Sequence, residues 1–144
     1  MNFCSMPQRY YLDACIWRDY LENRSDKFRP LGEWATRLIN KIIREKDIFV
    51  VTDLVEKELL KYCKKDEIQK MFQIIPEELF FSYTITEMQT RQALSLVREK
   101  KTPFFDTLHA FVAKELDAIF VTRDAHFQEL QEIVDSTQLT ADSL

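Results

Sequence analysis

Short runs of β-branched and aromatic residues recur along the chain and predict strands. In the run from Ile48 to Thr52, apolar residues do not alternate with polar ones, which is typical of a strand covered on both faces. We therefore expect this strand to be central in its sheet. The predicted strands span 10–13, 48–52, 79–83 and 118–122, and a weaker apolar pair at 133–134 could form a fifth.

Apolar residues spaced three and four positions apart predict helices between these strands. In residues 33–45 this spacing gives one buried stripe that includes Trp34, Leu38 and Ile42. In residues 104–116 the predicted stripe consists of Phe105, Leu108, Phe111, Val112 and Leu116. Further helices are predicted over 14–22, from 53 onwards, and over 66–75, 86–100 and 125–130.

Polar residues mark where two of these helices should begin. Asp53 is followed three residues later by Glu56, a plausible capping arrangement at the end of the second strand. Thr102 stands directly before Pro103, which is typical of a cap followed by a proline at the first helical position. We therefore expect Asp53 and Thr102 to act as helix caps.

The alternation of strands and helices predicts an α/β fold. Strands connected in this way pair in parallel, because right-handed crossovers place the helices on both faces of the sheet. At 144 residues the chain is close to the size of an average domain, so we expect a single domain over 1–144 with a mainly parallel sheet of four to five strands. Ligands of such sheets bind beyond the carboxyl ends of the strands, so the residues after each strand are the most informative.

The composition, 46% hydrophobic and 31% charged, is that of a soluble folded protein. The longest stretches without a charge, 1–8 and 79–86, hold only eight residues, whereas a membrane helix needs about 20 apolar residues. The N-terminus also lacks a basic start followed by an apolar run, the mark of a secretory signal. We expect a cytoplasmic protein without membrane association.

Glycine and cysteine usage excludes several function classes. Phosphate-binding loops and the nucleophile elbow of α/β-hydrolases need several glycines, and Gly32 is the only one in the chain. P-loop nucleotide hydrolases, dinucleotide-binding enzymes and α/β-hydrolases are therefore excluded. Three cysteines without a C-x-x-C pair suggest neither a disulfide framework nor a zinc cluster.

Charge is spread unevenly along the chain, whose net charge is -4. Residues 1–72 carry 14 Lys and Arg against 12 Asp and Glu, while residues 73–144 carry 6 against 12. General affinity for nucleic acids rests on a basic surplus, which this chain lacks. Three local basic strips could still contact a polyanion: Lys41, Arg44 and Lys46; Lys57, Lys61, Lys64 and Lys65; and Arg98, Lys100 and Lys101.

Acidic residues follow three of the predicted strands. Asp13 ends the first strand, Asp53 follows the second directly and Asp124 lies two residues after the fourth, and each could cap the next helix. Glu58 lies on or beside the buried stripe of its helix, where an unpaired carboxylate costs several kcal/mol and needs compensation. Asp106 lies in the first turn of its helix, where it could simply answer the helix dipole. It also shares a face with His109, Ala110 and Ala113, and small residues on that face would let the helix lie close to the sheet and place Asp106 near the strand ends.

A divalent cation would relieve the repulsion among these acids if they converge. Sites built from carboxylates and water suit Mg²⁺ or Mn²⁺ rather than zinc. With only His109 and His126 and no H-E-x-x-H motif, a zinc site is not expected. The chemistry that such sites serve best is metal-assisted phosphoryl transfer, and hydrolysis of a phosphodiester is the natural candidate.

Over essentially its whole length the chain resembles PIN-domain ribonucleases, and most of all the VapC toxins. The segments that carry this resemblance are 11–13, 52–59, 105–110 and 121–127. The resemblance implies a three-layer α/β/α sandwich, a dimer, Mg²⁺- or Mn²⁺-dependent cleavage of RNA, and an antitoxin protein as partner. We expect the RNA to be single-stranded and the dimer to be a homodimer. It implies that the metal ligands and catalytic acids are Asp13, Glu58, Asp106 and Asp124, with the hydroxyl of Thr122 beside them.

Asp53 matches none of the family's acids, so we expect it to serve only as a helix cap. A response-regulator receiver would need a phosphoacceptor after the third strand, where this chain has Ser82 to Thr84. A haloacid-dehalogenase phosphatase would need a second aspartate at the position of Cys15. The alternative that stays open is a PIN-like module that binds a partner or RNA without turnover.

Overall fold

The computed structural model describes residues 6–25 and 29–123, which form a four-stranded parallel sheet. The strand order is β3-β2-β1-β4, so the two central strands are β1 and β2, as the unbroken apolar run 48–52 predicts for β2. The strands are β1 (Arg9–Leu12), β2 (Ile48–Thr52), β3 (Phe80–Tyr83) and β4 (Ile119–Val121). The predicted helix at 125–130 and strand at 133–134 lie outside the described residues.

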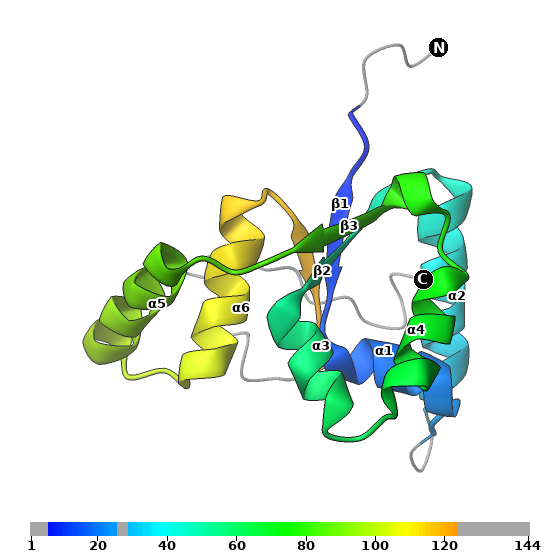
Figure 1. Cartoon of the computed structure of the whole chain (residues 1–144), viewed down its shortest axis with the longest axis horizontal. Helices are drawn as coiled ribbons and strands as arrows, with labels where there is room; N and C mark the ends of the chain where they lie inside the picture. Colours follow the sequence, from blue (N-terminus) through cyan, green and yellow to red (C-terminus); the bar gives the residue numbers. More distant parts are fainter. Residues whose placement is uncertain (1–5, 26–28, 124–144) are drawn as a thin grey trace.

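Helices cover both faces of the sheet and make a three-layer α/β/α sandwich, as predicted. Figure 1 shows the sheet between α5 and α6 on one side and α1, α2 and α4 on the other. The helices are α1 (Ala14–Glu22), α2 (Leu31–Arg44), α3 (Asp53–Leu60), α4 (Lys65–Gln73), α5 (Glu87–Lys100) and α6 (Phe104–Glu115), with a 3-10 turn η1 (Glu77–Leu79) before β3. Among the residues described, no helix is both long and apolar enough to span a membrane.

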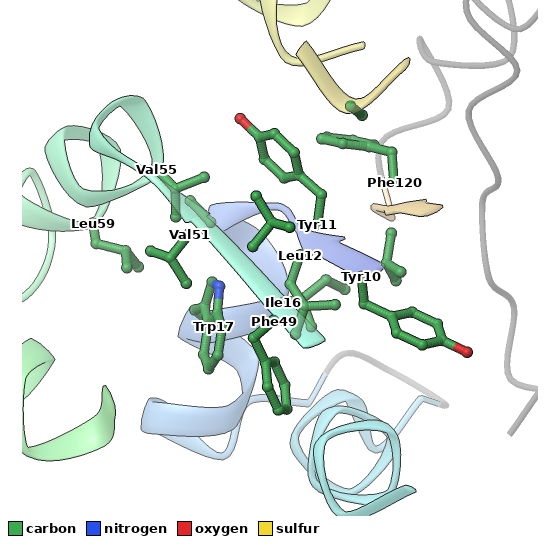
Figure 2. Packing of buried hydrophobic residues seen from close by; sticks show 14 of the residues in the cluster. Tyr10, Tyr11, Leu12, Ile16, Trp17, Phe49, Val51, Val55, Leu59 and Phe120 are labelled. Carbon is green, nitrogen blue, oxygen red and sulfur yellow. The ribbon is translucent and has the colours of Figure 1, made fainter. Parts of the chain in front are cut away.

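Aromatic side chains fill the core on the two faces of the sheet (Figure 2). Trp17 of α1 is fully buried and packs against Phe49 of β2 and Phe72 of α4, with ring centroids 5.8 and 5.1 Å apart. Tyr11 of β1 points the other way and packs on Phe120 of β4 at 5.1 Å. Successive residues of a strand face opposite sides, so the central strand β1 supplies both halves of the core.

The single glycine allows α2 to start against the end of α1. A Cβ atom at Gly32 would lie 2.5 Å from Cα of Asn23, too close for any side chain at this position. Asn23 ends α1 in the left-handed conformation, and the backbone N–H of Gly32 donates to the carbonyl of Arg24. Gly32 is therefore required for close packing between two helices, not for a ligand loop.

Both predicted helix caps are wrong by one residue. Thr52 caps α3 by accepting from the backbone N–H of Val55 at 3.2 Å, while Asp53 accepts from the N–H of Ile85 at 2.9 Å and so holds the segment after β3. Pro103 occupies the N-cap position of α6, and the hydroxyl of Thr102 instead pairs with that of Thr107. In each case the side chain that the spacing predicts to cap a helix forms a hydrogen bond with another residue instead.

The predicted apolar stripe of α6 is also partly wrong. Phe105 is 55% exposed and its ring packs on that of Phe104. His109, Ala110 and Ala113, which share a face with Asp106 by helical spacing, meet the sheet as predicted, and each is about 1% exposed. Two alanines let the helix lie close to the strands, and a buried histidine is brought with them.

Candidate metal centre

Asp13, Glu58 and His109 meet at the carboxyl end of the sheet. Asp13 follows β1, Glu58 lies in the second turn of α3 after β2, and His109 lies on α6. One ligand atom from each of the three lies within 4.8 Å of those of the other two. We call these three residues the triad. Parallel pairing explains the meeting, because the helices that follow β1 and β2 begin at the same edge.

Asp13 is held by its own helix and by β4. Its Oδ1 accepts from the backbone N–H of Ala14 at 2.8 Å, so it caps α1 as one of its two expected roles. Its Oδ2 accepts from the hydroxyl of Thr122 at 2.8 Å, and its own N–H donates to the carbonyl of Val121. The hydroxyl of Thr122 thus lies against Asp13, and these hydrogen bonds restrict the rotation of the carboxylate.

The compensation that Glu58 requires comes from His109. The Nε2–H group of His109 donates to Oε1 of Glu58 at 2.5 Å. The side chain of Glu58 is 29% exposed, whereas that of His109 is 2% exposed. In the part of the chain that is described, Oε2 of Glu58 accepts no hydrogen bond and is available to a ligand.

A buried hydrogen-bond chain continues from His109 into the core. Its Nδ1 is 2.6 Å from the hydroxyl of Tyr11, which is 2.9 Å from the hydroxyl of Thr52. Thr52 is itself fixed as the cap of α3, the helix that carries Glu58. The chain therefore closes a loop through β1, β2, α3 and α6 that fixes the orientation of the imidazole and, through it, of the carboxylate.

Three negative charges favour the protonated form of His109. Burial alone lowers the pKa of this imidazole, but the hydrogen bond to Glu58 and the charges of Asp13, Glu58 and Asp106 outweigh it. The pKa of His109 is therefore raised above its ordinary value. A protonated His109 donates from both ring nitrogens, to Glu58 on one side and to Tyr11 on the other.

Of the other two predicted acids, the structure describes Asp106 but not Asp124. Asp106 lies in the first turn of α6, three residues before His109, and its charge contributes to the raised pKa of that histidine. It is not one of the triad, and its role as a ligand stays a prediction. Asp124 lies outside the described residues, directly after Arg123.

Cys15 lies beside the triad, in surroundings that disfavour a reactive thiolate. Its Sγ is 3.5 Å from Oδ2 of Asp13 and 3.8 Å from the hydroxyl of Thr122. Burial, with the charge of Asp13, raises the pKa of this thiol to about 12. The reactive form of cysteine is the thiolate, which is scarce at neutral pH with such a pKa.

A buried ion cluster fixes the segment after β4. The carboxylate of Asp19 on α1 is 1% exposed and accepts from Nε of Arg123 at 2.6 Å and from Nη2 of Arg123 at 2.9 Å. Arg24 binds the same carboxylate at 2.9 Å. Because Arg123 follows Thr122 directly, this clamp also fixes the hydroxyl that binds Asp13.

Sequence reasoning missed His109, Tyr11 and Asp19 as residues that build the site. The signal for His109 was its place on the buried face of α6, three residues after Asp106. Asp19 could have been noticed as an acid among buried positions of α1. Nothing in the local pattern distinguishes Tyr11 from an ordinary core residue.

The donors at this site fit a hard divalent cation. Nε2 of His109 is engaged with Glu58, which leaves carboxylate oxygens of Asp13 and Glu58 as the candidate donors. Oxygen ligands of this kind suit Mg²⁺ or Mn²⁺. The hydrogen bonds from Thr122 and His109 orient the two carboxylates, as groups around metal ligands commonly do.

Residues 10–133 match the model of the PIN domain family. The chain belongs to this family. Among solved structures it is similar to a toxin-antitoxin complex from Klebsiella pneumoniae, with a TM-score of 0.66 and 15% identity over 92% of this chain and 97% of the other. It is also similar to VapBC2 from Rickettsia felis bound to a DNA fragment from the promoter, with a TM-score of 0.65 and 14% identity over 91% and 98%. A third similar structure is FitAcB from Neisseria gonorrhoeae, with a TM-score of 0.57 and 15% identity over 94% of this chain and 99% of the other.

Because the sequence identities are low, these similarities show that the chain shares the fold of those structures. No curated protein matches the chain.

Proposed function

We propose that this PIN domain is an endoribonuclease that uses Mg²⁺ or Mn²⁺ to hydrolyse phosphodiester bonds in single-stranded RNA. The observation that carries the proposal is the triad: two oriented carboxylates meet at the carboxyl edge of the sheet in a PIN fold. Asp13, Glu58, Asp106 and Asp124 are the proposed ligands and catalytic acids. Thr122 is the proposed hydroxyl at the site.

Each described residue has a distinct part in this proposal. A bound cation would activate a water for in-line attack at phosphorus and neutralise charge on the phosphate. Asp13, fixed by Ala14 and Thr122, and Glu58, fixed by His109, would hold that cation. His109 orients Glu58 through its hydrogen bond, and the nearby carboxylates raise the pKa of its imidazole.

The placement of the basic strips supports one route for the substrate. The strip over Lys57, Lys61, Lys64 and Lys65 lies on and after α3, the helix that carries Glu58, and all four lysines are exposed. The strip at Arg98, Lys100 and Lys101 precedes α6, which begins beside the site. The third strip ends α2 just before β2, at the opposite edge of the sheet, and we do not assign it to RNA.

We further propose that the chain is the toxin of a toxin-antitoxin pair and that it forms a homodimer. The similar structures from Klebsiella pneumoniae and Rickettsia felis support an antitoxin protein as partner. Exposed apolar side chains on the adjoining helices α5 and α6, Met88, Leu94 and Phe105, support association with a second copy. Light scattering should give twice 17.2 kDa, and a mass of 17.2 kDa at all micromolar concentrations would contradict the dimer.

The nuclease proposal is tested by incubating the purified protein with structured and unstructured RNAs at low salt. We expect cleavage of unpaired segments with Mn²⁺ or Mg²⁺, none with EDTA, and none with Asp13→Asn. Asparagine is as good a helix cap as aspartate, so this variant should keep α1 intact. Asp66→Asn, an exposed acid on α4, is the matched control and should cleave normally. If saturating Mn²⁺ produces no cleavage, the non-catalytic binding module takes the place of the nuclease.

A further inference from the structure

Tyr62 is an exposed aromatic ring that lies one helical turn beyond the triad. Its side chain is 62% exposed, although it lies directly after α3 next to the buried Cys63. The guanidinium carbon of Arg18 lies 3.8 Å from the centre of its ring. One face of the ring is thus covered by a cation, and the high exposure leaves the other face open to solvent.

The Arg18–Tyr62 pair and the triad lie along the same two helices. Asp13 caps α1 and Arg18 follows five residues later, while Glu58 lies on α3 and Tyr62 follows four residues later. At 1.5 Å per residue in a helix, each step is roughly 6–8 Å. Backbone hydrogen bonds from Lys61 to Glu58 and from Tyr62 to Leu59 continue the coil past the end of α3. The ring therefore lies within reach of a nucleotide next to one held at the triad.

The charges around the ring favour a polyanion with unpaired bases. Lys57, Lys61 and Lys64 are exposed on the same segment and could bind phosphates. Arg18 is also paired with Glu22 at 3.3 Å, which keeps its guanidinium in place beneath the ring. A flat aromatic face beside cations is the arrangement on which single-stranded nucleic acids stack their bases.

We infer that Tyr62, supported by Arg18, is a stacking platform for one unpaired base of the RNA, adjacent to the scissile phosphate. This inference rests on the proposed function, since it places the ring along the path of a substrate held at the triad. It gives a physical reason for a preference for single-stranded RNA: a base paired in a duplex cannot place its face on the ring. Tyr62 is thus a positioning residue for the substrate.

The first test measures binding of a short, labelled, single-stranded RNA by fluorescence anisotropy in EDTA, where no metal-dependent cleavage occurs. Tyr62→Ala should weaken binding about tenfold, while Tyr62→Phe, which keeps the ring, should stay within about twofold of the unchanged protein. Met6→Ala, a change at an exposed apolar residue ahead of β1, should have no effect. Should Tyr62→Ala fail to fold, Tyr62→Leu covers Arg18 without a ring and replaces it.

The second test replaces the bases of the RNA one at a time by an abasic sugar. One position should weaken binding to the unchanged protein and have no further effect on Tyr62→Ala, because the two changes remove the same interaction. Equal binding by Tyr62→Ala and the unchanged protein would overturn the inference. So would a Tyr62→Ala variant that binds RNA normally but loses self-association in sedimentation, since the ring would then belong to a protein interface.

The binding assay in EDTA separates this inference from the nuclease proposal. If the ring contributes to RNA binding but Mn²⁺ produces no cleavage, the stacking platform stands and the nuclease fails. If Mn²⁺ produces cleavage that Tyr62→Ala leaves unchanged in both KM and kcat, the nuclease stands and the platform fails. If both hold, Tyr62→Ala should raise KM with little change in kcat, because the ring acts on substrate binding.

Discussion

Glu58 and His109 pair at the carboxyl edge of the sheet, with Oε1 and Nε2 2.5 Å apart. The pair joins α3 to α6, helices separated by about fifty residues of chain. A carboxylate at this partly buried position needs a partner, and the histidine supplies a hydrogen bond that accompanies the raised pKa of its imidazole. The hydrogen bond thus gives one acid of the candidate site a fixed position.

The raised pKa of His109 predicts a pH-dependent stability of the metal-free protein. A histidine whose folded-state pKa lies above its unfolded value, about 6.5, contributes stability that is complete below that value. This contribution should be lost as the pH rises through the folded-state pKa. Urea unfolding in EDTA should therefore show a difference in unfolding free energy between the unchanged protein and His109→Gln that shrinks from pH 6 towards high pH. An NMR titration that places the pKa of His109 below 6.5 would contradict this.

Divalent metal should stabilise the folded protein. A ligand that binds only the native state adds about 2.7 kcal/mol when present at a hundred times its Kd, which for a domain of this size raises Tm by roughly 8 °C. We expect this shift with Mn²⁺ or Mg²⁺ in differential scanning fluorimetry, and its loss in Asp13→Asn. An equal shift in Asp13→Asn would mean that the metal binds elsewhere.

Asp106→Asn separates stability from activity. Removing one negative charge near the triad relieves repulsion in the metal-free protein, so Tm in EDTA should stay level or rise. RNA cleavage should nevertheless be abolished, because Asp106 is a proposed ligand, and such a trade between stability and function is common at active sites. Full cleavage by this variant would remove Asp106 from the ligand set.

The clamp at Asp19 should be important for stability. Asp19→Ala leaves Arg123 and Arg24 without their buried partner, and breaking such a pair typically costs about 3 kcal/mol. Glu22→Ala on the same helix removes only partly exposed ion pairs with Arg18 and Arg24, and should cost less than about 1 kcal/mol. Chemical denaturation of both variants measures the difference, and equal losses would contradict the clamp.

The salt dependence of RNA binding should come from lysines on and after α3 rather than from the basic residues of α2. In EDTA, the double variant Lys57→Gln with Lys61→Gln should flatten the plot of log affinity against log salt by about 1.4, if both lysines contact phosphates of a single strand. Lys41→Gln with Arg44→Gln removes the same charge from the opposite edge of the sheet and should leave the slope unchanged. The reverse result would place the RNA on the other side of the molecule.

Local patterns determined most of the secondary structure and the fold class. The run 48–52 forms the predicted central strand because an unbroken apolar run needs cover on both faces. The alternation of strands and helices was enough to predict parallel pairing, and hence that Asp13 and Glu58 would lie at one edge. The need of Glu58 for compensation could also be predicted, because its place beside the apolar stripe of α3 follows from helical spacing.

Only the tertiary structure decided which groups meet. His109 forms a hydrogen bond with Glu58, and the backbone N–H of Ile85 donates to the carboxylate of Asp53. Arg123 donates to Asp19, which lies about a hundred residues earlier in the chain. Spacing along a helix or strand specifies neighbours within a few residues, whereas these contacts depend on strand order and on how closely each helix lies on the sheet. The sequence by itself therefore determined the edge of the sheet at which Asp13 and Glu58 lie. The packing of α3 and α6 decided that His109 is the hydrogen-bond partner of Glu58.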